Sequence, residues 1–273
     1  MSDDRPTMRI TASDLSAPVV EEYLETQAYL TRDVGEVGDQ PWLIRVIYAN
    51  WFYLAVTGAI GGLIAWLILE PFFDDKVEGV QLSAILMFPV VAGFVGMFVG
   101  AAEGLMCRNG LRTVISGAVG LGVGFAGGLV ALFPAGMVFN IMTQIAVAFW
   151  RDPQPGEMPT GLALLIWMMG RAAAWGIVAI PAGIGQGIAL RERKVIINGL
   201  VGGVLGGMVG GLLFDPIYLI LTSADGQATY SRAVGFMTIG LFVGLFIGLV
   251  EGWTKTAWLL MRKGPLAGKQ FIL

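Results

Sequence analysis

The sequence predicts an all-α polytopic membrane protein with six glycine-packed transmembrane helices. Apolar residues make up 56% of its 273 residues and charged residues only 14%, whereas an ordinary globular domain has about 25% charged residues. Glycine supports the same prediction, because its 40 residues recur at helical spacing within the apolar runs.

A spanning helix needs about 20 predominantly apolar residues. Six segments meet this requirement: Tyr48–Leu69, Leu82–Met106, Thr113–Phe133, Leu164–Leu190, Val195–Leu221 and Ala233–Leu260. The apolar stretch of the third span continues beyond Pro134, and because proline breaks helices we expect the span to end there. We therefore expect the segment near 135–163 to lie in the outer interface, or to re-enter the membrane, before the fourth span.

Most of the 17 basic residues fall on one side of these spans. By the positive-inside rule this side is cytoplasmic. We therefore expect the chain to cross a bacterial-type inner membrane with both termini in the cytoplasm. We expect residues 1–45 to form an acidic cytoplasmic arm, 46–261 the transmembrane domain and 262–273 a cytoplasmic tail. Within the arm, residues 17–30 fit either a docking helix or a partly ordered tail.

Glycines at every fourth position form stripes on five of the predicted spans. Such stripes let helix backbones approach closely in lipid, where packing rather than water exclusion drives helix association. The alternative interpretation is that they give room to a ligand or a hinge. The helix-packing candidates are Gly58, Gly62, Gly96, Gly100, Gly124, Gly128, Gly203, Gly207, Gly244 and Gly248.

The glycine patterns also predict an internal repeat. The first and fifth spans share a G-x-x-G-G pattern, followed at equal spacing by Glu70-Pro71 and Asp215-Pro216. Because proline disfavours helix in the residue before it, these two acids are expected to mark helix ends. The even-numbered spans share an ending with Glu103, Gln186 or Glu251 at one position. We expect three parallel two-helix repeats in a three-fold bundle.

A candidate polar cluster comprises Glu103, Gln186, Glu251 and Arg171. Charged groups in a membrane are costly and usually face protein or water. The first three residues would form a cation or proton site if they converge. The structural alternative is hydrogen bonding between helices, or pairing of the acids with Arg108, Arg191 or Lys255. Arg171 lies either inside the fourth span or at its outer boundary.

The composition disfavours enzyme chemistry. The chain has no histidine and a single cysteine, Cys107, which excludes a Ser-His-Asp couple, histidine ligation of zinc or haem, and an internal disulfide. We expect no catalytic, cofactor-binding or metal-binding residues. The net charge of −3 gives little attraction for nucleic acid, so the expected partners are the lipid bilayer and proteins of a membrane complex.

The C-terminal residues depart from the glycine-helix pattern and indicate a turn followed by a short strand. Gly264, Gly268, Phe271 and Leu273 match the Gly-x-x-x-Gly-x-x-Phe-x-Leu opening of a forkhead-associated (FHA) domain. Together with residues 251–258 and the glycine-rich spans, this stretch resembles the membrane portion of bacterial membrane proteins that carry such a domain. The resemblance implies a β-sandwich that binds phosphothreonine peptides, with its phosphate-reading residues after Leu273. The alternative is a short tail.

Two functions compete on this sequence. The first is a non-enzymatic membrane scaffold, anchor or accessory subunit that tethers a cytoplasmic phosphopeptide-binding domain. The second is a small-solute or ion channel or transporter that uses Glu103, Gln186, Glu251 and Arg171. A dry, glycine-packed axis would favour the scaffold, whereas a continuous polar pore would favour transport.

Overall fold

The computed structural model describes residues 46, 49–74, 82–150, 158–221, 228–254, 258–260 and 270–272. They belong to one compact unit, Val46–Leu273; the predicted arm of residues 1–45 and its helix at 17–30 lie outside the described residues. Six described helices are long and apolar enough to cross a membrane, as predicted. They are α4 (Asn50–Leu69, followed by the 3₁₀ turn η1, Glu70–Phe72), α5 (Leu82–Met106), α6 (Gly110–Ala148), α7 (Leu162–Leu190), α8 (Arg193–Leu221) and α9 (Thr229–Thr254).

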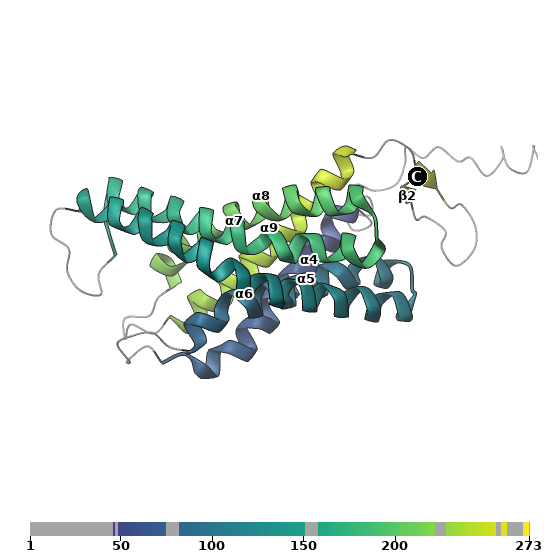
Figure 1. The fold of residues 1–273 in the computed structure, drawn as a ribbon, viewed down its shortest axis with the longest axis horizontal. Helices are drawn as coiled ribbons and strands as arrows, with labels where there is room; N and C mark the ends of the chain where they lie inside the picture. Colours follow the sequence, from purple (N-terminus) through teal and green to yellow (C-terminus); the bar gives the residue numbers. More distant parts are fainter. Residues whose placement is uncertain are drawn as a thin grey trace, which may run out of the picture. The chain divides into compact units, whose positions relative to one another are not determined.

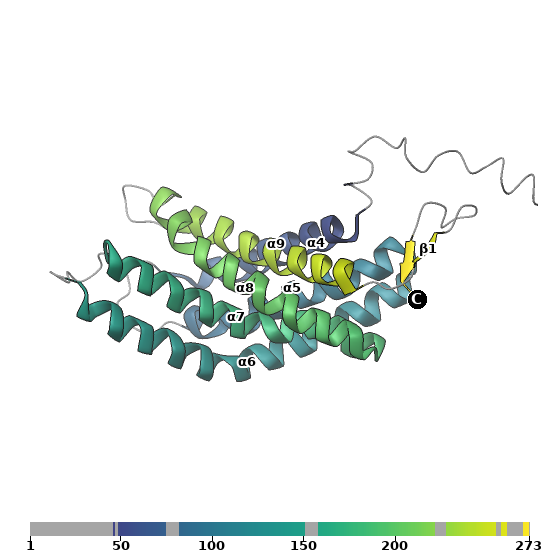
Figure 2. The same cartoon turned by 90° about the horizontal axis from the view of Figure 1, so that it is seen from above.

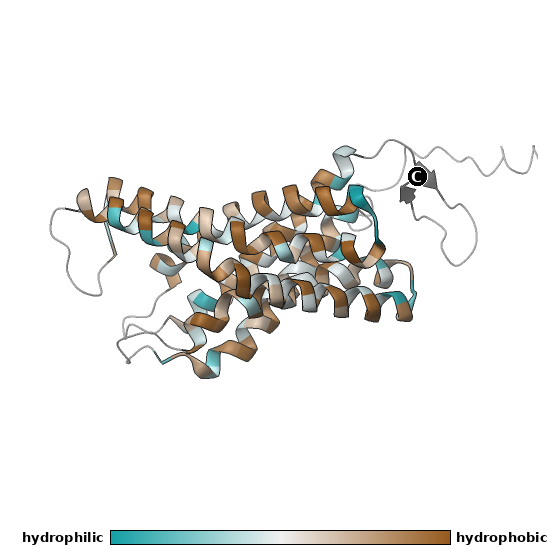
Figure 3. Ribbon diagram, viewed as in Figure 1, coloured by the Kyte–Doolittle hydropathy of each residue, from teal (hydrophilic) through white to brown (hydrophobic). Residues whose placement is uncertain are grey.

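The bundle consists of three inner helices and three outer helices (Figures 1 and 2). α5, α7 and α9 contact one another, and each of the other three helices lies against two of them: α4 against α5 and α9, α6 against α5 and α7, and α8 against α7 and α9. Hydrophobic residues predominate along all six helices (Figure 3). The first and last helices of the bundle, α4 and α9, therefore pack against each other and close the arrangement.

Glycine sets the separation between neighbouring helices. A β-carbon added to Gly58 would collide with the backbone of Gly240, and the same holds for Gly96 against Gly120 and for Gly183 against Gly199. Every glycine predicted to pack helices makes such a close approach. Gly58 and Gly62 face α9, Gly96 and Gly100 face α6, Gly124 and Gly128 face α5, Gly203 and Gly207 face α7, and Gly244 and Gly248 face α4.

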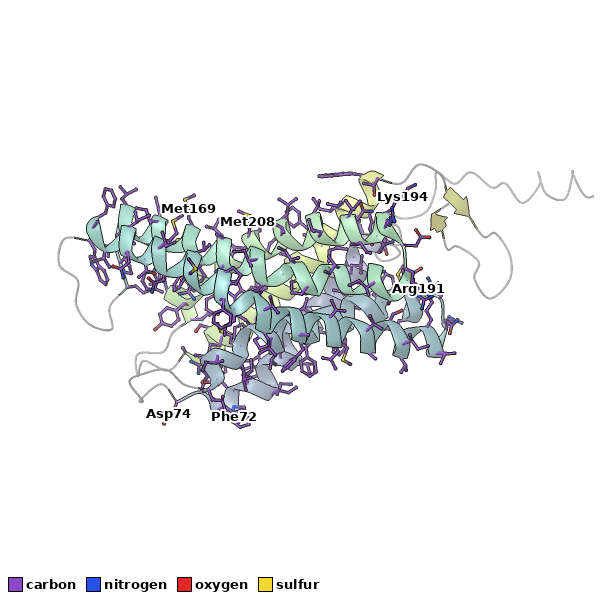
Figure 4. The ribbon with its side chains drawn as sticks, viewed as in Figure 1. Phe72, Asp74, Met169, Arg191, Lys194 and Met208 are labelled. Atoms are coloured by element: carbon purple, nitrogen blue, oxygen red, sulfur yellow. The ribbon has the colours of Figure 1, made fainter. Side chains whose placement is uncertain are left out.

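Two tight turns connect the helices at the end where Arg191 and Lys194 lie (Figure 4). Arg108 and Arg191 adopt left-handed backbone conformations, with φ of 51° and 57°, and end α5 and α7. The backbone then folds back, so that the Asn109 amide donates to the Gly104 carbonyl and the Glu192 amide to the Gly187 carbonyl. The Asn109 side chain also caps α6 by accepting from the Arg112 amide at 3.0 Å. The two hairpins thus share one turn geometry.

The prediction that Pro134 breaks the helix of the third span is wrong. α6 runs without interruption through Pro134 to Ala148, over 39 residues, and α7 begins at Leu162. The described parts of the predicted interfacial segment near 135–163 therefore extend α6 or lead into α7. Proline removes one backbone donor, and helices in apolar surroundings tolerate this loss when the remaining hydrogen bonds hold. For the same reason Asp215-Pro216 does not end α8, which continues to Leu221, whereas α4 does end before Glu70-Pro71.

The sixth span also ends earlier than predicted. α9 stops at Thr254, and Trp258–Leu260 form a short strand, β1, instead of the last turn of a helix. β1 pairs with β2 (Gln270–Ile272) in antiparallel register, with Leu259 opposite Phe271. β2 is the short strand that the sequence predicted near the C-terminus. Its partner, β1, consists of apolar residues that the sequence analysis assigned to the sixth span.

Candidate functional site

Two ion pairs lie at the end of the bundle opposite Arg191 and Lys194. In the first, Arg232 of α9 donates two hydrogen bonds to the carboxylate of Glu70 in η1. They run from Nη2 to Oε1 at 2.7 Å and from Nε to Oε2 at 3.0 Å. Trp66, one turn earlier on α4, donates its indole N–H to Oε2 at 2.9 Å. The Arg232 guanidinium also lies 4.7 Å from the centroid of the Phe73 ring. Glu70 is therefore held from two helices.

The second pair joins Arg171 of α7 to Asp215 of α8. Arg171 Nε lies 2.9 Å from Asp215 Oδ1, which is close enough for an ion pair, but the orientation does not make a hydrogen bond. The Asp215 side chain is 0% exposed and the Arg171 side chain 21%. The guanidinium lies 5.2 Å from the ring centroids of both Phe139 and Phe214. Within the described residues, neither Asp215 oxygen receives a hydrogen bond.

The charged residues bracket a slab about as thick as a bilayer core. At a rise of about 1.5 Å per residue, Arg171 lies about 30 Å from Arg191 along α7, and Asp215 about 33 Å from Arg193 along α8. The hydrocarbon core of a membrane is about 30 Å thick. We call the two ends the basic end (Arg108, Arg112, Arg191, Arg193 and Lys194) and the ion-pair end (Glu70, Arg171, Asp215 and Arg232). This spacing places Arg171 inside helix α7 but at the edge of the apolar slab.

The residues of the predicted polar cluster have separate surroundings. Glu103 pairs with Arg112 of α6 at 2.8 Å, with both side chains at least about a third exposed, and Glu251 Oε2 accepts a hydrogen bond from the side-chain Nδ2 of Asn50 on α4 at 2.6 Å. Gln186 is buried, and its carbonyl oxygen has no hydrogen-bond partner among the described residues. The acids thus bind neighbouring helices, as the structural alternative proposed, although Glu103 uses Arg112 instead of the expected arginines.

Arg171 cannot join the other three residues in one site. It lies on the same helix as Gln186, about 22 Å away along the axis at about 1.5 Å per residue. Gln186 lies toward the basic end, whereas Arg171 is one of the residues that define the ion-pair end. Within the described chain, no group of three acidic, cysteine or histidine residues is placed to hold a metal ion.

The axis between α5, α7 and α9 is closed and apolar. In its middle section it encloses a small cavity of about 10 Å³, lined by Val91, Ala92, Val95, Trp175, Val178, Ala179, Ala182, Ile239 and Val243. Toward the ion-pair end, Phe88, Trp175 and Phe236 form an aromatic layer across the three helices, with ring centroids 5.1 and 6.1 Å apart. A solvated ion does not fit this space, and the lining offers it no ligands.

A second hollow lies between α4 and α9 and opens outward. It measures about 350 Å³ and is lined by apolar and aromatic side chains from both helices: Trp51, Phe52, Ala55, Val56, Ala59, Ile60, Leu63, Met237, Leu241 and Leu245. None of these lining residues is titratable. Its lining suits contact with lipid chains or an apolar helix.

Sequence reasoning missed both ion pairs, although the signals were present. The repeat alignment places Glu70 and Asp215 at one position, and Arg171 and Arg232 each lie near the start of a span, so that two acids and two arginines occur at related places. Comparison of the chain with protein-family models, curated proteins and solved structures finds no match. The FHA resemblance therefore stays a prediction.

Proposed function

We propose that this polytopic membrane protein is a non-enzymatic integral membrane scaffold, or an accessory subunit of a larger complex. The closed axis is the observation that carries the proposal. In the middle section the three inner helices meet along apolar side chains, around a cavity of about 10 Å³. A transporter or channel needs a path for its solute, and the described axis offers a packed core in its place.

Three close helix pairs set the packing of this bundle, and they do not follow the predicted repeat of an odd-numbered span and the even-numbered span after it. The pairs α5–α6, α7–α8 and α4–α9 each contain a reciprocal glycine contact, made by Gly96 with Gly120, Gly183 with Gly199, and Gly58 with Gly240. The turns after Arg108 and Arg191 are alike. Backbone contact of this kind packs the helices closely together. Such a bundle suits a protein that holds partners in fixed positions.

The basic end is the side on which we expect partners to dock. Arginine and lysine concentrate there, and the positive-inside rule makes it the cytoplasmic face of a bacterial-type inner membrane. The same rule predicts that the acidic N-terminal arm is also cytoplasmic. The paired strands β1 and β2 follow α9 directly, and they support a role in tethering a cytoplasmic phosphopeptide-binding domain of the FHA type.

Native co-purification combined with a flux measurement tests this function. The full chain is tagged, extracted in native nanodiscs, and its bound proteins are identified, while the purified chain is reconstituted in liposomes loaded with ion-sensitive dyes. We expect constant stoichiometric partners and no ion flux above empty liposomes. A large flux that falls when Glu103→Gln or Glu251→Gln is introduced would instead establish the channel that uses Glu103, Gln186, Glu251 and Arg171. Thr143→Val, outside these positions, is the control.

A further inference from the structure

The two tight hairpins at the basic end share a backbone geometry and differ in charge. Each ends a helix with an arginine in the left-handed conformation, Arg108 or Arg191, and each closes with the same hydrogen-bond pattern. Counted back from these arginines, Gln186 of α7 occupies the place of Glu103 of α5. In the first hairpin Glu103 pairs with Arg112 at 2.8 Å. The second hairpin has a neutral amide in place of this carboxylate.

The second hairpin carries three exposed cations, Arg191, Arg193 and Lys194, which we call the hairpin cations. Figure 4 shows Arg191 and Lys194 at the same end of the bundle. Within the described residues, none of the three side chains makes an ion pair or a hydrogen bond. Glu192 is the only acid of this turn in the sequence, and it is exposed. Three cations therefore stand against one acid here, whereas the ion pair of the first hairpin leaves Arg108 as its remaining cation.

Next to the hairpin cations, α8 presents a line of exposed apolar side chains. Ile197, Val201 and Leu205 follow Lys194 at spacings of three, four and four residues, and they are between 39% and 61% exposed. Residues at this spacing share one face of a helix. At about 1.5 Å per residue the line extends about 16 Å from Lys194, which is about half the thickness of a hydrocarbon core. One side of α8 thus carries cations at the edge of the slab and apolar side chains through the depth of one leaflet.

We propose that the hairpin cations and this apolar line bind an anionic phospholipid of the leaflet at the basic end. The lipid phosphate supplies the negative charge and the acceptor oxygens that arginine and lysine bind, and an acyl chain lies along Ile197, Val201 and Leu205. Lysine and arginine close to the membrane surface attract anionic lipids, and each strengthens the binding roughly fivefold. The first hairpin, in which Arg112 is already paired, should hold such a lipid less well.

An acidic protein matches this surface less well than a lipid does. A soluble partner would reach the hairpin cations from the cytoplasm, but the apolar line begins at Ile197, inside the slab, where hydrocarbon surrounds it. A phospholipid combines the charged head and the apolar chain in one molecule, in the order that this side of α8 requires. The proposal goes beyond the function proposed above, because a scaffold and a channel both contact lipid.

Quenching by brominated lipid measures which lipid lies against Ile197. In a Cys107→Ser background, the full chain carries Ile197→Cys labelled with bimane, in phosphatidylcholine liposomes with increasing fractions of phosphatidylglycerol whose chains are brominated. Val114→Cys on α6 is the matched control, because Val114 occupies the corresponding place after the first hairpin and is also exposed. We expect the preference for phosphatidylglycerol over phosphatidylcholine to be about fivefold stronger at position 197 than at position 114. Equal preferences at the two positions would overturn the proposal.

Charge variants test the cause of this preference. Arg193→Gln combined with Lys194→Gln removes two exposed charges, and we expect the two lipids to bind at position 197 within about twofold of each other. Arg193→Lys combined with Lys194→Arg keeps both charges and should leave the preference unchanged, while circular dichroism in the same liposomes compares the helix content of the variants. A preference that survives the glutamine pair, or that disappears in the charge-keeping pair, would refute the lipid site. Absence of any preference in the otherwise unaltered chain would also refute it, and would assign the hairpin cations to an acidic protein.

Discussion

The two ion pairs use the same kinds of residue and differ in how completely they are satisfied. Glu70 receives three hydrogen bonds, from Arg232 twice and from Trp66 once. Asp215 is more deeply buried, and within the described chain its ion pair with Arg171 Nε at 2.9 Å lacks the orientation of a good hydrogen bond. The Trp167 indole N–H, one turn from Arg171, has no partner there either.

This difference separates burial from stabilisation. A buried ion pair must recover the cost of leaving water, and it does so only when additional hydrogen bonds satisfy both partners. The pair of Glu70 and Arg232 meets this condition, whereas the pair of Asp215 and Arg171 relies on the rings of Phe139 and Phe214 around the guanidinium. We therefore expect the first pair to stabilise the bundle and the second to contribute little net stability.

The largest effect is expected for Glu70→Ala. It leaves the Arg232 guanidinium and the Trp66 N–H without their acceptor in a partly buried site, and we expect a loss of about 3 kcal/mol of unfolding free energy, the lower end of the range for fully buried pairs. Equilibrium unfolding in mixed SDS and dodecyl maltoside micelles, followed by circular dichroism, measures the change. Glu103→Ala, which removes a pair that is more than a third exposed, is the control and should cost less than about 1 kcal/mol. Similar losses for both variants would contradict the role assigned to Glu70.

An apolar replacement of both partners sharpens the comparison. Arg171→Met combined with Asp215→Leu removes two incompletely satisfied charges, and we expect the unfolding free energy to stay equal or to rise by about 1–4 kcal/mol. Arg232→Met combined with Glu70→Leu should lower it, because three good hydrogen bonds are lost. The same micelle titration compares the two double variants. If the Arg171 and Asp215 variant unfolds more easily than the other, the ranking of the two pairs is reversed.

The smallest effects are expected for the two indoles. Trp66→Phe deletes a donor to a carboxylate, and hydrogen bonds to charged groups contribute about 1.5–3 kcal/mol. Trp167→Phe deletes an N–H that has no partner among the described residues, so only the small change in ring size remains. Thermal unfolding of the two variants in one detergent should show a lower midpoint for Trp66→Phe alone. Equal midpoints would mean that the Trp66 bond adds nothing to Glu70.

The sequence predicted the six spans because hydropathy reports directly on helices that cross a membrane. The glycines followed for a similar reason, since a residue without a side chain at every fourth position has few uses other than close packing. The helix ends predicted at Pro134 and Pro216 were wrong. The local preference of proline against helix was overridden in long apolar helices, where the neighbouring backbone bonds have no competing water.

The candidate site was harder to predict because it depends on which helices are neighbours. Glu70 and Arg232 are far apart in the chain and meet only because α4 packs against α9. Glu103, Gln186 and Glu251 occupy equivalent positions relative to the glycines of their helices. This spacing carries no information about their partners on other helices, which are Arg112 for Glu103 and Asn50 for Glu251. Local pattern identified the helix faces, and long-range topology determined the partners.

The contact of α4 with α9 also constrains how the bundle is made. α4 leaves the ribosome before the other five described helices, and its glycine face matches α9, the last of the six. At synthesis rates of roughly 5–20 residues per second, the delay between Gly58 and Gly240 is about 10–40 s. During that interval the membrane, or the insertion machinery beside it, contains an incomplete bundle in which α4 has not yet packed against α9.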